Sequence, residues 1–115
     1  MIQVIEERRR STCFDDLRKQ VEGTVDDIKG IEDIGTFLTE EALDIARRQS
    51  LIDGEWETEY YEICIAWGGP GLWFRTDGII TGAWWGDYLK VKVEDPDFLA
   101  KLEEIREYLD ETLGG

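Results

Sequence analysis

Histidine is absent from this chain of 115 residues, and serine, cysteine and proline are scarce. Without histidine the chain lacks the commonest general base and metal ligand of enzymes. Its only serines, Ser11 and Ser50, do not stand in the strand-to-helix turn that presents a nucleophilic serine. No apolar run approaches the roughly 20 residues that a membrane-spanning helix needs. These absences argue against the usual hydrolase and metalloenzyme sites and against a membrane protein.

The few chemically versatile groups that are present also lack the spacing of a reaction site. Cys13 and Cys64 have no further ligands near them, which predicts free thiols in a reducing cytoplasm, with a disulfide between them as the alternative. The glycine-rich segment 68–71 has no lysine after it, so it is not a phosphate-binding loop. Acid pairs such as Asp26-Asp27 lack the pattern of a calcium loop. We therefore predict no enzymatic activity, no catalytic residues, no cofactor and no metal.

Bases are few relative to acids. The chain has 27 acidic and 13 basic residues, a formal net charge of −14. Such a field repels nucleic acid and anionic membranes, and it favours partners with a basic surface. The alternative is that the charge only keeps a small protein in solution.

What is abundant is a strand pattern between residues 57 and 93. Four segments rich in β-branched and aromatic residues are separated by turn residues, and we predict strands over 60–67, 72–76, 79–85 and 88–93. Asp77-Gly78 predicts a two-residue type I′ hairpin turn, since both of its central residues need a positive φ. Gly86-Asp87 is predicted as a second tight turn.

Helical patterns flank this stretch. Apolar residues recur at spacings of three and four from Phe14 to Ile28, a second helix is predicted from the N-cap Thr39 to about Ser50, and a third from Pro96 to Leu113. Residues 1–5 are either a short edge strand or a helix leader. The sequence thus predicts one α+β domain over residues 1–115, a four-stranded antiparallel β-meander with two N-terminal helices and one C-terminal helix, in the order α-α-β-β-β-β-α.

The predicted turns assign side chains to the two faces of the sheet. With a two-residue loop at Asp77-Gly78, Trp73 shares one face with Ile80, Gly82 and Trp84. The opposite face carries Phe74, Trp85 and Tyr88. Either helices cover both faces, or this aromatic face is a contact surface for a partner or a second copy of the chain.

A row of acids precedes the first predicted strand. No base occurs between Arg48 and Arg75, and five acids fall in that interval, namely Asp53, Glu55, Glu57, Glu59 and Glu62. In an extended chain Glu55, Glu57 and Glu59 point to one side, about 6.6 Å apart from the ~3.3 Å rise per residue. Such a row is comparable to the phosphates of one nucleic-acid strand, and it predicts binding in a basic groove. The alternative is a solvated face.

The segment from Tyr60-Tyr61-Glu62-Ile63 to Gly68-Gly69-Pro70, followed by aromatic strands, resembles small uncharacterised acidic proteins of phages and mobile elements. The resemblance covers about residues 60–87 and carries no site residues with it. It implies an anti-restriction or anti-CRISPR context. The leading hypothesis is an inhibitor that binds the basic nucleic-acid groove of a host nuclease or defence complex and does not itself bind nucleic acid. The alternatives are an assembly module, homodimeric through the aromatic sheet face, and a carbohydrate or ligand binder that uses exposed tryptophans.

Overall fold

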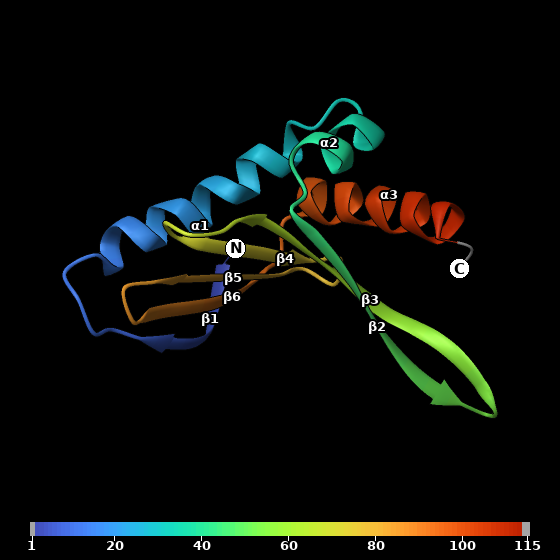
Figure 1. Ribbon diagram of the computed structural model, residues 1–115, viewed down its shortest axis with the longest axis horizontal. Helices are drawn as coiled ribbons and strands as arrows, with labels where there is room; N and C mark the ends of the chain where they lie inside the picture. Colours follow the sequence, from blue (N-terminus) through green and yellow to red (C-terminus); the bar gives the residue numbers. More distant parts are fainter. Residues whose placement is uncertain (1, 114–115) are drawn as a thin grey trace.

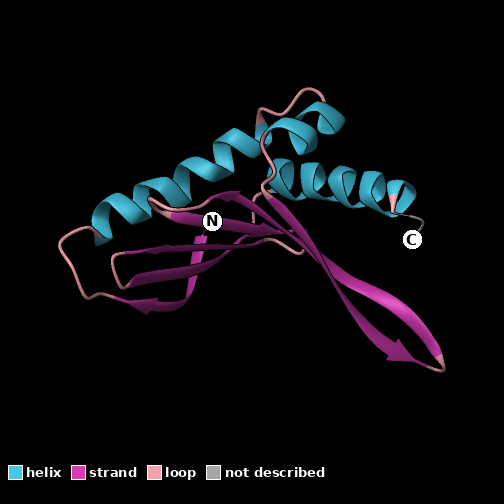
Figure 2. Cartoon of the chain, in the orientation of Figure 1, coloured by secondary structure: helices cyan, strands magenta, loops and turns pink. Residues whose placement is uncertain are grey.

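The structure, a computed structural model, describes residues 2–113, which fold into two layers. The elements are β1 (Ile2–Arg8), α1 (Phe14–Lys29), α2 (Ile34–Glu40), β2 (Asp44–Ile52), β3 (Glu55–Ala66), β4 (Gly71–Arg75), β5 (Ile79–Trp84), β6 (Asp87–Val93) and α3 (Pro96–Thr112). The six strands form one antiparallel sheet in the order β1-β6-β5-β4-β3-β2. The helices lie together on one side of it (Figure 1; Figure 2). None of the described helices is long and apolar enough to cross a membrane.

The α+β class is confirmed, but the predicted four-stranded meander is wrong because β1 and β2 extend the sheet to six strands. The helix predicted over residues 39–50 is replaced by the short α2, capped by Asp33, and by strand β2. Asp53 and Gly54 form a turn in which φ is 51° and 82°, and this turn folds β2 back onto β3. Pairing along β3 thus overrides the local helical pattern of residues 42–46.

The predicted turn at Asp77-Gly78 contains the right residues but has the wrong length. Phe74 pairs with Ile80, which leaves a three-residue loop instead of two. The Gly78 amide donates to the Arg75 carbonyl over 3.1 Å and Gly78 has a φ of 99°, so the loop is a turn followed by a left-handed glycine. One extra residue reverses the faces: Phe74 lies with Ile80 beneath the helices, and Trp73 lies on the open face.

The second hairpin turn is also displaced along the chain. It consists of Trp85 and Gly86, with φ of 52° and 82°, instead of Gly86-Asp87. Trp84 therefore packs against the core while Trp85 projects into solvent. Asp87 is buried, and its carboxylate accepts hydrogen bonds from the Ser11 hydroxyl at 2.6 Å and from the backbone amides of Arg10 and Ser11. This carboxylate ties the segment after β1 to the start of β6.

The hydrophobic core lies between the helices and one face of the sheet. Leu17 and Val21 of α1 pack directly on Gly82 of β5, where a Cβ atom would come within 2.8 Å of each side chain. The C-terminal helix is fixed to β3 by polar contacts. The Tyr61 hydroxyl donates to Asp110 over 2.6 Å, and the Arg106 guanidinium donates to the Thr58 and Glu59 carbonyls over 2.6 Å and 3.0 Å. These contacts hold residues 58–61 of β3 against α3.

Candidate functional site

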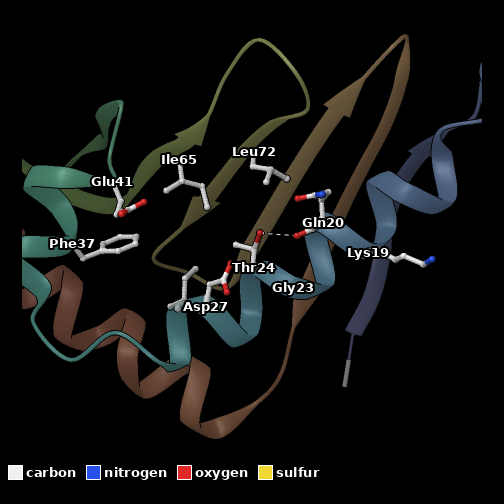
Figure 3. A pocket seen from close by; sticks show the side chains of 10 residues that line it. Lys19, Gln20, Gly23, Thr24, Asp27, Phe37, Glu41, Ile65 and Leu72 are labelled. Carbon is white, nitrogen blue, oxygen red and sulfur yellow. Dashed lines mark hydrogen bonds between the residues drawn. The ribbon is translucent and has the colours of Figure 1, made fainter.

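A groove of about 460 Å³ opens between α1, α2 and the adjoining ends of β3 and β4 (Figure 3). Its polar groups do not form a reactive set. The Thr24 hydroxyl donates to the Gln20 carbonyl over 2.8 Å, and it makes no hydrogen bond with Asp27 or Glu41, the two carboxylates that also line the groove. Covalent catalysis needs a nucleophile within hydrogen-bond reach of a base. We therefore assign no chemistry to this groove.

The thiols are no better placed for chemistry. Cys13 and Cys64 are both free, so the alternative of a disulfide between them is not realised. Burial raises the pKa of the Cys64 thiol above its ordinary value, which keeps it protonated and a poor nucleophile. Among residues 2–113, no group of three or more histidine, cysteine or acidic side chains could hold a metal ion.

The feature that stands out is the outer half of the β2–β3 hairpin, which projects away from the body of the molecule (Figure 1). Strand β4 pairs with β3 only between Glu62 and Ala66, so residues 49–59 have no third strand beside them. A β-bulge between Arg48 and Gln49 marks where the projection begins. We call residues 49–59 the arm.

One face of the arm is apolar and looks toward the C-terminal half of α3. Leu51 pairs directly with Trp56, and their side chains are 60 % and 67 % exposed. A wide groove of about 650 Å³ separates Trp56 from Arg106 and Asp110 of α3. Two large exposed apolar side chains standing together on a protrusion are unusual on an isolated protein and typical of a binding surface.

The other face of the arm is acidic. Glu55 and Glu57 stand two residues apart on it, opposite Ile52 and Ser50. The Ser50 hydroxyl donates to Glu59, which places the Glu59 carboxylate on that face too, where Arg48 lies 3.6 Å away. The structure thus brings together Glu55, Glu57 and Glu59 as the sequence predicts, with Asp53 at the tip. The arm contains these four acids and no base.

Glu62 lies apart from this row, in the body of the sheet. It is half-buried and pairs across the sheet with Arg75. Arg75 is itself engaged, donating to Asp77 over 2.9 Å and stacking on the Tyr60 ring at 3.7 Å. Arg75 is therefore engaged within the body of the sheet, whereas Arg48 is the base that pairs with the acidic row, at Glu59.

The predicted aromatic set of Phe74, Trp85 and Tyr88 is not brought together. Phe74 is fully buried beside Phe37, with ring centroids 6.2 Å apart. Trp85 is 73 % exposed at a turn, and Tyr88 lies half-buried on the open face. The reason is the three-residue loop after β4, which moves Phe74 to the helix-covered face.

Sequence reasoning missed Leu51 and Trp56. Their pairing could have been found from Asp53-Gly54, because a type I′ turn there places Leu51 opposite Trp56. Comparisons of the chain with protein-family models, curated proteins and solved structures gave no match. Function is therefore inferred from the surface of this chain.

Proposed function

We propose that this chain is a non-enzymatic inhibitor whose arm enters the basic, nucleic-acid-binding groove of a partner protein. The observation that carries the proposal is the combination of an acidic face and an exposed Leu51–Trp56 pair on one projecting hairpin. The resemblance of residues 60–87 to phage and mobile-element proteins favours a host nuclease or defence complex as that partner.

The two faces of the arm have different roles in this proposal. Glu55, Glu57 and Glu59 take the place of successive phosphates, which speeds encounter with a basic groove and makes binding sensitive to salt. Trp56 and Leu51 lose water on binding and supply affinity that salt does not screen. The chain binds no nucleic acid itself, because its net charge of −14 repels phosphate.

The test compares two variants that each remove three charges. The arm variant combines Glu55→Gln, Glu57→Gln and Glu59→Gln. The control variant changes Glu32, Glu103 and Glu107 to Gln, exposed acids outside the arm that form no ion pair among the described residues. Each immobilised protein is exposed to lysate of a candidate bacterial host at low and high salt, and retained proteins are identified by mass spectrometry.

We expect a nucleic-acid-binding protein that the parent and the control variant retain, that duplex DNA elutes, and that the arm variant does not retain. Equal retention by the arm variant, with unchanged salt dependence, would refute the role of the acidic row. If Trp56→Ala also bound normally, the whole arm would be excluded from the interface.

A second candidate function is an assembly module, and the specific observation for it is strand β1. This strand forms one edge of the sheet, and Ile2, Val4 and Ile5 are all exposed along it. An open edge can pair with the same strand of a second copy. Sedimentation velocity distinguishes the two functions, since the assembly module predicts a dimer that Val4→Lys dissociates.

A further inference from the structure

At the end of the hairpin opposite the arm, two tryptophans form a corner. Trp67 and Trp73 meet at an interplanar angle of 86° with ring centroids 5.7 Å apart. They line a pocket of about 310 Å³ together with Leu43, Asp44 and Cys64. Trp67 is 73 % exposed and Leu43 is 61 % exposed, so the pocket opens to solvent. We call this site the tryptophan corner.

The fold builds the corner from three adjacent strands. Asp44 of β2 pairs with Cys64 of β3, and Cys64 pairs with Trp73 of β4, so these three side chains stand in a row on the open face. Trp73 can lie flat at the start of β4 because the neighbour beneath it is Gly71, where a Cβ atom would come within 2.6 Å of the indole. The Leu43 amide donates to the Cys64 carbonyl over 2.8 Å and closes the side of the pocket.

The chemistry of the lining points to a cation with an apolar surface. Leu43, Cys64 and the two indoles are apolar, and Asp44 is the one charged group. No lysine or arginine among residues 2–113 forms an ion pair with Asp44. Burial raises the pKa of the Cys64 thiol, and the charges of Asp44 and Glu62 act in the same direction, so the pocket floor is a neutral thiol. Sugars would need several polar partners that this lining lacks.

We propose that the tryptophan corner binds an alkylammonium group, most favourably a trimethylated one. The indole faces attract the positive charge and contact the methyl groups, and Asp44 supplies the counter-charge. Methylated lysine on a protein and a free quaternary ammonium compound share this chemistry. The proposal is independent of the arm, because Cys64 lies nine residues along β3 from Glu55, about 30 Å away at the ~3.3 Å rise per residue.

The experiment titrates the ¹⁵N-labelled full chain with three probes and follows the indole N–H signals by NMR. The probes are tetramethylammonium, a short peptide containing trimethyl-lysine, and the same peptide with a neutral tert-butyl side chain of the same shape. We expect both cations to shift the indole signals of Trp67 and Trp73. The neutral peptide should bind at least about twofold more weakly than the trimethyl-lysine peptide, because it lacks the cation–π attraction.

Substitutions then locate the site. Trp67→Ala should weaken cation binding by about two- to fivefold, and Asp44→Asn should weaken it by up to about fivefold, as the loss of an exposed ion pair does. Both residues are exposed, so the fold should survive. Trp85→Ala is the matched control, since Trp85 has the same exposure but lies at another turn. If the trimethyl-lysine peptide binds more tightly than tetramethylammonium, the natural ligand is a methylated lysine on a protein. If the two affinities are equal, the ligand is a free quaternary ammonium compound. Absence of shifts at Trp67 and Trp73, or equal binding of the neutral peptide, would overturn the proposal.

Discussion

Replacing Gly82 by alanine places a methyl group between the sheet and α1, where there is no room for it. The new Cβ would lie 2.8 Å from Leu17 Cδ1, 2.8 Å from Val21 Cγ2 and 3.4 Å from Leu72 Cδ2. Leu17 and Val21 are fully buried, so neither can swing into solvent. Either α1 shifts off the sheet or a side chain leaves its rotamer, and such overpacking costs about 1–3 kcal/mol.

A gain in the unfolded state partly offsets that cost. Alanine restricts the unfolded chain more than glycine does, which stabilises the fold by about 0.4–1 kcal/mol where the native conformation permits it. We therefore expect Gly82→Ala to lower the free energy of unfolding by about 1–2 kcal/mol in net terms.

Gly23→Ala in α1 is the matched control, because its Cβ would meet no atom within 4 Å apart from its chain neighbours and the adjoining backbone of α1. There we expect stabilisation of about 0.5–1 kcal/mol, the helix-propensity difference. Urea unfolding followed by tryptophan fluorescence measures both variants, and the slope of the transition should stay constant. A Gly82→Ala variant as stable as the parent would refute the packing of α1 against β5.

Three further predictions concern single side chains. Ser11 and the backbone amides of Arg10 and Ser11 lower the pKa of Asp87 in the folded chain. The contribution of Asp87 to the free energy of unfolding is therefore fully present above the unfolded pKa and is lost as pH falls through the lower folded pKa. Unfolding measured across acid pH should show this loss, and Asp87→Asn should remove this part of the pH dependence. Trp56→Ala should change stability by no more than about 0.5 kcal/mol, because the side chain is exposed, yet abolish salt-resistant binding of the retained partner. Trp85→Asn should raise the urea midpoint, because asparagine tolerates the φ of 52° better than a bulky residue; an unchanged or lower midpoint would show that the turn is not strained.

Local patterns predicted the elements whose stability is mostly local. The spacing of apolar residues located α1 and α3, and the Asp95-Pro96 pair marked the start of α3, where Asp95 accepts hydrogen bonds from the first turn. Strand β2 was missed because Ala42, Leu43 and Ile45 have helical spacing. Only pairing with β3, at separations of up to 20 residues between Asp44 and Cys64, makes residues 44–52 a strand.

The register of β4 depended on a contact that a local pattern does not contain. Asp77-Gly78 fits either a two-residue or a three-residue loop, since both place glycine at a positive φ. The Thr76 hydroxyl accepts a hydrogen bond from the Tyr61 amide over 3.0 Å. This contact joins the loop after β4 to strand β3 and is present with the three-residue loop. The acidic row was predictable from alternation alone, whereas the Leu51–Trp56 pair required β2 to be recognised first.

The missing third strand beside the arm has a consequence for its motion. A two-stranded ribbon is only marginally stable in water, because it buries little apolar surface. The amides of residues 49–59 should therefore exchange with solvent through local opening, at a free energy well below that of global unfolding, while those of β5 and β6 exchange only when the whole chain unfolds. A hairpin that opens in this way can adjust its twist to grooves of different width. Binding fixes the arm in one conformation and so costs conformational entropy. A disulfide between β2 and β3 in the arm would lower that cost, which would strengthen binding to one groove and reduce the range of grooves that the arm can bind.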